Sequence, residues 1–428
     1  YIGGDMKIEY TGIKDLTGIG NLQEIRGTFW LKYNYYLVSL AGITKLTRID
    51  GGLYLDENQV LTNIDDLAGI TYIGGYVRIF NNGSLSTLEP LGNLTYIGED
   101  FWVYNNDALT TMPDLTRLTF LGTDLKISNN ALLAKSGKYI GIKAIHGNLL
   151  MNANPILVDF PDLDSVSIIE GDLEITNNTA LPDLSGMDGL ESIGGDLLLN
   201  QNASLITLEA LKNLASVGEN MTISSNLSLN RLTDLQNLTY LGGDLRVADN
   251  DLLNDLTGLG NISAGSIKNL EIFGNEKLAY CAVESLCNYL ASPGGTVEIH
   301  DNAPGCNSRV EVDSDCDSIA HPCPTGGITF STQAQVDSFL IRYPICTEIH
   351  GDLTISGSDI TNLTELQNIA FIHGNLIIAG NSNLGNLEGL NGLTTIDSSL
   401  TIDDNDVLIT LTALAGLTHT GKTLHIED

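Results

Sequence analysis

The stretch GGDLLLNQNASLITLEALKNL, residues 194–214, carries the pattern that decides the fold. Leu197 and Leu199 alternate across Leu198, which is the pattern of a short β-strand. After Asn202 the leucines are spaced by three, at Leu205, Leu208, Leu211 and Leu214. This spacing, with frequent glycine and asparagine, favours tight corners or 3₁₀ turns that each direct one apolar side chain inward, and it does not fit an amphipathic α-helix.

The same pattern recurs along the chain, almost always at steps of 24 residues. The apolar residues that open the expected strands are Met6, Phe29, Leu53, Val77, Phe101, Leu125, Leu149, Leu173, Leu197, Met221, Leu245, Leu270 and Val297. After an interruption the series resumes at Leu353, Leu376, Leu400 and Leu424. A fixed period of this length is typical of a solenoid, in which each coil packs only on its neighbours. We therefore predict a mainly β fold, a right-handed parallel solenoid whose strands form a long sheet.

An asparagine follows the strand at the same position of almost every coil. This column includes Asn58, Asn106, Asn130, Asn202 and Asn250, and only Thr11 and Ser358 interrupt it. An amide at that corner can donate to and accept from backbone groups that the turn leaves unpaired, and it can stack on the next amide. We predict a structural ladder here and not an active site.

The chain has 428 residues, is 43% hydrophobic and carries a formal net charge of −33, from 53 acidic and 20 basic residues. Such a charge opposes binding to nucleic acid and to anionic membranes, but it leaves cations, basic proteins and neutral glycans open as partners. Because there is no apolar run of about 18 residues, we expect no membrane insertion.

Six cysteines lie between Cys281 and Cys346 and none elsewhere. Their spacing contains no CxxC pair, which argues against a zinc ribbon and favours disulfides formed in an oxidising compartment. We therefore expect the protein to be extracellular or at the cell surface.

The pattern L-x-x-I-x-G-D-L-x-I-x-x-N-x-x-L-x-x-L-x-x-L, as in Leu190 to Leu211, resembles leucine-rich repeats in their helix-poor form, and most of all the L domains of growth-factor receptors. Residues 278–355 resemble the cap-and-restart segment of large secreted bacterial leucine-rich repeat proteins, which are commonly cargo of type IX secretion. The resemblance implies a solenoid architecture and a surface location.

Two short helices are expected in the interrupting segment. Val283, Leu286, Cys287 and Leu290 are spaced as on one helix face, and Pro293 stops the pattern. The resemblance to disulfide caps implies the pairs Cys281–Cys306 and Cys287–Cys316, although four cysteines allow three pairings.

Thr332 and Gln335 form a capping box that opens the second helix, and Cys323 is expected to bond Cys346 beside it. We predict two domains. Residues 1–322 would form thirteen coils and a cysteine-rich C-terminal cap, and residues 323–428 would form a helical disulfide N-cap and four coils. No cap follows the last strand, so we expect either a solenoid that continues beyond residue 428 or protomers that stack end to end.

Three motifs suggest other chemistry. Residues 416–423, GLTHTGKT, match a phosphate-binding loop, but they precede an expected strand, whereas such a loop must open a helix. His350 and His373 fall in the same corner slot of adjacent coils and could share zinc, yet no third ligand is evident and solvated turn histidines are the better interpretation.

Aspartates that alternate at Asp313, Asp315 and Asp317, or cluster at Asp403, Asp404 and Asp406, resemble calcium ligands but lack the glycine and glutamate of an EF-hand. We predict no metal site and no cofactor, with calcium as the alternative.

Two columns of residues should point outward from the long sheet. In the second to fifth coils they gather both tryptophans with other aromatic and basic side chains: Trp30, Lys32, Tyr54, Arg78, Phe80, Trp102 and Tyr104. Rings on a sheet can simply stabilise it through cross-strand stacking. An exposed aromatic patch of this size more often marks an interaction surface, so we predict a ligand-binding face with the two tryptophans about 14 Å apart.

We expect a non-enzymatic adhesion or recognition protein that binds a surface glycan or protein on this face. One alternative is a structural subunit of a surface fibre or layer, assembled end to end from copies of itself. The other is a carbohydrate-active enzyme, but no Ser/His/Asp or Cys/His pattern stands out. Binding lost with Trp30 and Trp102 would support the first function, concentration-dependent polymers the second and released sugars the third.

Overall fold

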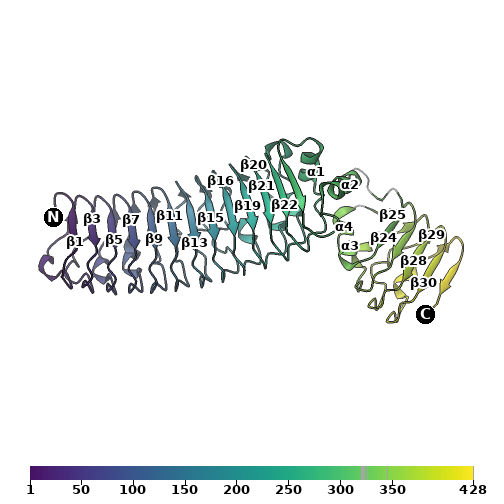
Figure 1. The fold of residues 1–428 in the computed structure, drawn as a ribbon, viewed down its shortest axis with the longest axis horizontal. Helices are drawn as coiled ribbons and strands as arrows, with labels where there is room; N and C mark the ends of the chain where they lie inside the picture. Colours follow the sequence, from purple (N-terminus) through teal and green to yellow (C-terminus); the bar gives the residue numbers. More distant parts are fainter. Residues whose placement is uncertain (320–322, 325, 345, 428) are drawn as a thin grey trace. The chain divides into compact units, whose positions relative to one another are not determined.

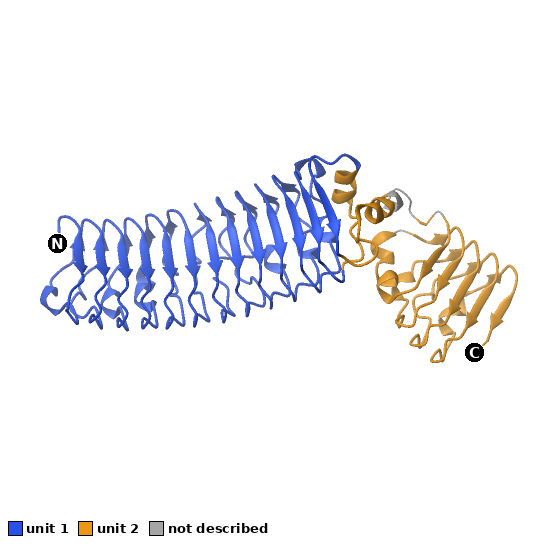
Figure 2. Cartoon of the chain, in the orientation of Figure 1, with its two compact units in different colours: residues 1–277, 291–301 blue, residues 278–290, 302–428 orange. Residues whose placement is uncertain are grey.

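The computed structural model describes residues 1–319, 323–324, 326–344 and 346–427. The chain divides into two compact units, one of residues 1–277 and 291–301 and the other of residues 278–290 and 302–428 (Figure 2). Each unit is built on a parallel sheet to which every coil adds one strand (Figure 1). The predicted parallel leucine-rich-repeat solenoid is confirmed.

The first unit contains a sheet of 13 parallel strands, in chain order. These are β1 Met6–Glu9, β3 Phe29–Lys32, β5 Leu53–Asp56, β7 Val77–Phe80, β9 Phe101–Tyr104, β11 Leu125–Ser128, β13 Leu149–Asn152, β15 Leu173–Thr176, β17 Leu197–Asn200, β19 Met221–Ser224, β21 Leu245–Ala248, β22 Leu270–Phe273 and β23 Val297–His300. Each predicted opening residue is the first residue of its strand. The apolar period therefore fixes the register as well as the number of coils.

Two shorter parallel sheets lie elsewhere on the same coils. The first contains β2 Glu24–Ile25, β4 Arg48–Ile49, β6 Tyr72–Ile73, β8 Tyr96–Ile97 and β10 Phe120–Leu121. The second contains β12 Ala144–Ile145, β14 Ile168–Ile169, β16 Ser192–Ile193, β18 Ser216–Val217 and β20 Tyr240–Leu241. Sequence analysis did not predict these two-residue strands, because their only signal is one aliphatic residue that lies one or two positions before a glycine.

The turns with apolar residues at every third position include short 3₁₀ helices, as the spacing predicts. In the first unit they are η1 Thr17–Ile19, η2 Asp65–Leu67, η3 Glu89–Asn93, η4 Glu209–Leu211, η5 Thr233–Leu235, η6 Thr257–Leu259 and η7 Ala264–Ser266. Leu205, Leu208 and Leu211 are all fully buried. The core is thus a column of leucine and isoleucine inside the coils.

The asparagine column forms a buried ladder. Asn202 is fully buried, and its amide donates to the carbonyl of Ile175 at 2.8 Å and to Asn226 Oδ1 at 3.3 Å. Its own Oδ1 accepts the backbone N–H of Asn178 at 3.1 Å. The residue before it, Gln201, has φ 59°, so each corner turns through the left-handed region and the ladder amide satisfies the backbone there.

In the second unit, Gly357 and not Ser358 takes the ladder position, because its N–H donates to Asn381 Oδ1 at 2.9 Å.

A second ladder precedes the long strands and was not predicted. The N–H of Asp196 donates to Asp172 Oδ1 at 2.9 Å, and the N–H of Asn220 donates to Asp196 Oδ1 at 2.8 Å. The aspartate of the repeated G-D-L therefore has a structural role. In this second ladder each backbone N–H donates to a side chain of the preceding coil. In the asparagine ladder each backbone N–H donates to a side chain of the following coil.

The second unit has a five-stranded parallel sheet and a four-stranded one. The first contains β24 Ile328–Phe330, β26 Leu353–Ile355, β28 Leu376–Ala379, β30 Leu400–Asp403 and β32 Leu424–Ile426, and the second contains β25 Glu348–Ile349, β27 Phe371–Ile372, β29 Thr395–Ile396 and β31 His419–Thr420. Two 3₁₀ helices, η8 Thr364–Leu366 and η9 Thr412–Gly416, lie in its turns. Strand β24 adds one coil to the four predicted.

The helices of the described residues are α1 Glu284–Ala291, α2 Arg309–Ile319, α3 Gln333–Asp337 and α4 Phe339–Arg342. None combines the length and the apolar character that a membrane crossing requires. Helix α1 coincides with the first predicted helix, and Thr332 caps α3 with the predicted capping box. Helix α2 was not predicted, since its aspartates were interpreted as a loop.

Three disulfides join Cys281 to Cys306, Cys287 to Cys316 and Cys323 to Cys346, the pairs that the resemblance implied. All six cysteines belong to the second unit. The expected domain boundary between residues 322 and 323 borders residues 320–322, which lie outside the described residues, and it stays a prediction.

Candidate functional site

The predicted face lies on four neighbouring strands, β3, β5, β7 and β9. The register pairs Trp30 with Tyr54, Tyr54 with Arg78, and Arg78 with Trp102, which makes one outward row. A second row pairs Lys32, Asp56, Phe80 and Tyr104 in the same way. The structure therefore brings all seven predicted residues together, and we call this group of side chains the aromatic face.

The rings of the aromatic face pack on one another. Trp30 and Tyr54 have ring centroids 4.9 Å apart, and Phe80 and Trp102 have theirs 4.7 Å apart in an edge-on arrangement. Tyr54 joins the two pairs through Phe80 at 5.6 Å. Each of these side chains is half-buried as a result, whereas the sequence suggested fully exposed rings. The face is a closely packed surface and not a set of separate projecting rings.

Tyr76 belongs to this face, although sequence analysis missed it. It occupies the position of the second ladder, where most coils carry Asp or Asn, and its ring lies 6.2 Å from those of Trp30 and Tyr54. The Arg78 guanidinium stacks over it at 4.3 Å. The signal in the sequence was the pair Gly52 and Tyr76, which together break the Asp/Asn column.

Four cations surround the rings on a chain that is otherwise strongly acidic. The Lys32 ammonium lies 4.1 Å from the Tyr54 centroid and 4.6 Å from that of Trp30. Lys7 lies over Trp30 and Lys126 over Trp102, at 5.9 and 5.4 Å. Contacts of this kind fix the cations against the ring faces.

Carboxylates balance these cations unevenly. Arg78 pairs with the buried Asp100 at 3.0 Å and Lys126 with Asp124 at 2.7 Å. Lys32 has no carboxylate within 4.0 Å among the residues that the structure describes. Burial raises the pKa of the Asp56 carboxyl beside it. Lys32 is therefore the cation of the face that has no ion-pair partner among the described residues.

Neither indole is held by a hydrogen bond. Within the described part of the chain, Nε1 of Trp30 and Nε1 of Trp102 are both covered by protein and have no acceptor. A buried indole N–H usually finds a partner, so both rings are positioned by packing alone.

The first unit carries a second row of rings, on the short strands β6, β8 and β10. Tyr72 and Tyr96 stack at 4.8 Å, and Tyr96 and Phe120 at 4.9 Å. The Arg48 guanidinium covers the end of this row, 3.7 Å from the Tyr72 ring. Its parallel stacking resembles a structural ladder more than a binding surface.

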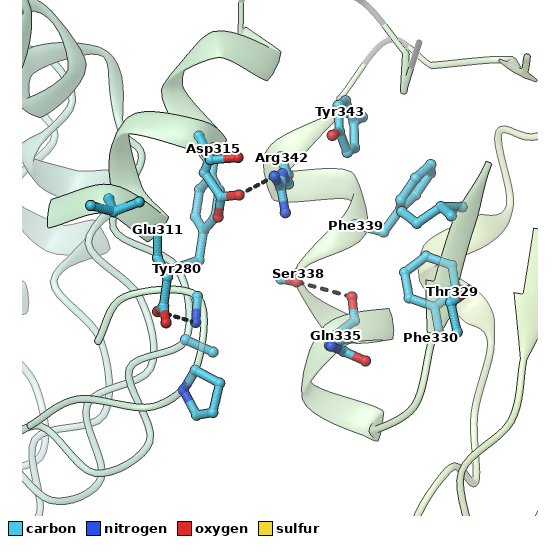
Figure 3. A pocket seen from close by; sticks show the side chains of 16 residues that line it. Tyr280, Glu311, Asp315, Thr329, Phe330, Gln335, Ser338, Phe339, Arg342 and Tyr343 are labelled. Atoms are coloured by element: carbon cyan, nitrogen blue, oxygen red, sulfur yellow. Dashed lines mark hydrogen bonds and ion pairs between the residues drawn. The ribbon is translucent and has the colours of Figure 1, made fainter. Parts of the chain in front are cut away.

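A cavity of about 470 Å³ lies in the second unit (Figure 3). Its lining includes Tyr280, Phe339 and Tyr343, together with an ion pair between Asp315 and Arg342. Burial raises the pKa of Asp315 to about 6, although Arg342 acts in the opposite direction. Burial also raises the pKa of the Tyr280 hydroxyl. A nucleophile with an adjacent base is not found among these lining residues.

The structure also places the phosphate-loop match and the aspartates of the junction. The phosphate-loop match runs from η9 through β31 to β32, so no helix follows it and the rejection from context is supported. Asp313 and Asp315 lie in helix α2 and face Arg309 and Arg342. The prediction of no metal site and no cofactor, with calcium as the alternative, stays a prediction.

Comparisons with known proteins found one matching family and several similar solved structures. The Receptor L domain family matches residues 143–253 and 345–419, together less than half of the chain. A search of curated proteins found no match. The solved structures that resemble the chain include an internalin from Listeria monocytogenes, with 16% identity, 95% of this chain and 87% of that chain covered and a TM-score of 0.31. A leucine-rich repeat protein from Leptospira interrogans has 12% identity, 96% and 94% coverage and a TM-score of 0.24.

Together with the coils, the family match supports a leucine-rich-repeat-like protein with a role in recognition.

Proposed function

We propose that this protein is an extracellular, non-enzymatic recognition protein that binds a surface glycan or protein ligand through the aromatic face. The observation that carries the proposal is the concentration of both tryptophans and four cations on neighbouring strands of a chain with net charge −33. Three disulfides are typical of an oxidising compartment and support the location.

The geometry suits an extended ligand. The rows of the face cross the strands, so Trp30 and Trp102 are separated by three rungs, about 14 Å. Sugar rings or the aromatic side chains of a partner can stack on Tyr54 and Phe80 between them, while Lys32 attracts a carboxylate or sulfate. Large aromatic and basic side chains are the groups that most often dominate binding energy at an interface.

The test is a screen of the purified chain on an array of neutral and anionic glycans and of surface proteins. The double variant Trp30→Ala/Trp102→Ala is screened beside it, with Tyr72→Ala/Tyr96→Ala as the matched control because it removes two stacked rings from the other row. Circular dichroism establishes that both variants remain folded. Binding that the control retains and the tryptophan variant loses would support the proposal. Equal binding by both variants, or binding by neither variant nor parent, would overturn it for the ligands tested.

A further inference from the structure

Four polar side chains converge at one corner of the second unit. His350 follows β25, His373 follows β27 and Asp397 follows β29, and the register of these strands places the three in one column. Glu348, the first residue of β25, lies beside them. Sequence analysis identified the two histidines from their equivalent positions in adjacent coils. It missed Glu348, which occupies a different position of the coil.

The ligand atoms of three of these residues are close together. One atom each from Glu348, His350 and His373 lie within 4.8 Å of one another. Glu348 Oε2 is 3.0 Å from His373 Nε2, and Glu348 Oε1 is 4.0 Å from His350 Nε2. The two imidazoles are parallel within 3°, with centroids 5.3 Å apart. A single ion can therefore lie within reach of both rings and of the carboxylate.

The fourth residue orients one of the histidines. Asp397 Oδ2 is 2.9 Å from His373 Nδ1, so the carboxylate can accept a hydrogen bond from the Nδ1–H tautomer and leave Nε2 to face Glu348 and His350. A carboxylate behind a histidine is the usual outer partner of a metal-bound imidazole, since it fixes both the tautomer and the ring orientation.

We propose that Glu348, His350 and His373 bind a divalent zinc-class metal ion, with Asp397 as the positioning residue for His373. Two imidazoles and one carboxylate suit zinc better than calcium, which prefers an all-oxygen shell. Tetrahedral zinc places its ligand atoms about 3.3 Å apart, so a modest rotation of the His350 ring completes the site. The ligand side chains are 38 to 48% exposed, so the ion has free entry and keeps an open position for water or a ligand.

The bound ion would join two coils. Glu348 begins β25 and His350 follows it, while His373 follows β27, so the metal cross-links adjacent rungs close to the disulfide of Cys323 and Cys346 in sequence. Because a metal that binds the folded state stabilises it by mass action, the second unit would become more stable as the free zinc concentration rises.

The test uses the full, tag-free chain, freed of metal with a chelator, and titrates it with Zn²⁺ by calorimetry and with Co²⁺ by visible absorption. We expect one ion per chain and a tetrahedral cobalt spectrum. His350→Ala, His373→Ala and Glu348→Gln should each weaken binding by roughly tenfold or more, and Asp397→Asn by about tenfold.

The matched control is His146→Ala. His146 lies at the same corner of the first unit and pairs with Glu170 at 3.0 Å, but the structure places no second histidine in a metal-binding group with it among the described residues. This variant should bind zinc like the parent. Absence of binding by the parent, or binding that the three ligand variants leave unchanged, would overturn the proposal.

Discussion

The ring of Tyr76 lies directly over Gly52, where an added Cβ would come within 2.7 Å of two ring carbons and 2.9 Å of the Tyr76 carbonyl oxygen. Glycine at this position is what allows an aromatic residue to replace the Asp/Asn ladder in the next coil. The largest ring cluster of the face therefore depends on a residue that has no side chain.

Substitution of Gly52 by alanine should destabilise the first unit by about 1 to 3 kcal/mol, because the ring and the backbone behind it must both shift. Both tryptophans of the chain lie in this unit, so their fluorescence during urea unfolding reports on it alone. Gly18→Ala is the control, since a Cβ there meets nothing within 4 Å. Equal unfolding midpoints for the two variants would show that Tyr76 is not packed as described.

Loss of a single ladder amide should lower the free energy of unfolding by more than Gly52→Ala does. Asn130 is fully buried and donates to the carbonyl of Ser128 at 3.0 Å, while its Oδ1 accepts the N–H of Asn106 at 3.1 Å. Alanine would leave these backbone groups buried without partners, so we expect Asn130→Ala to lower the free energy of unfolding by about 3 kcal/mol or more.

The neighbouring Asn129 provides the control for the ladder variant. It is exposed and has φ 53°, and alanine already occupies the equivalent corner in the next coil, at Ala153 with φ 54°. Asn129→Ala should therefore change the tryptophan-detected midpoint only slightly. A cost as large as that of Asn130→Ala would contradict the assignment of the stability to the ladder amides.

Reducing agents should act on one unit only. All three disulfides lie in the second unit and both tryptophans in the first. Reduction should lower the stability of the second unit by about 2 to 4 kcal/mol for each bond, as followed by circular dichroism, and leave the tryptophan transition in place. Movement of the tryptophan transition with reductant would show instead that the two units unfold together.

The stability of the second unit should decrease as the pH rises from about 4 to about 6. Burial raises the pKa of Asp315 from 3.8 to about 6, so in this window the folded state keeps a proton that the unfolded chain releases. The full effect is at most about 3 kcal/mol. Asp315→Asn should remove this part of the pH dependence in urea unfolding followed by circular dichroism.

Asp313→Asn is the control for the pH experiment. Asp313 lies in the same helix, is 47% exposed and pairs with Arg309. This variant should show the same change in the free energy of unfolding between pH 4 and pH 6 as the parent. A parent whose stability rises between pH 4 and pH 6 relative to the Asp315 variant would contradict a raised pKa.

The sequence predicted the long strands and the asparagine ladder, which recur in almost every coil, but it did not predict the short strands or the second ladder, which also recur. The opening residue of each predicted strand was identified because the apolar period is carried by many coils at once, and the ladder asparagines were identified for the same reason. Some features that occur only once were also not predicted. Helix α2 was missed because its alternating aspartates suggested a loop, and β24 was missed because residues 328–330 lie outside the regular series.

The candidate sites show the same division. The residues of the aromatic face could be gathered from the sequence, because outward positions follow from strand register. Their packing could not, since the half-burial of Trp30 depends on contacts with Tyr54 and Tyr76 from other coils. Likewise, the contact between Glu348 and His373 could not be predicted. The two residues belong to neighbouring columns of the coils, and the repeat period gives no distance between columns.

The two ladders run in opposite directions, so each coil both donates hydrogen bonds to and accepts them from each of its two neighbours. A whole coil that is duplicated or deleted finds the same partners above and below. The coil from Leu245 to Leu270 is one residue longer than the usual 24 and keeps both columns, because its extra residue lies between Asn250 and Asn269. The protein can therefore change its reach in steps of one complete coil, and variation within a coil is open to side chains that point outward. Length and surface chemistry are for this reason free to evolve independently.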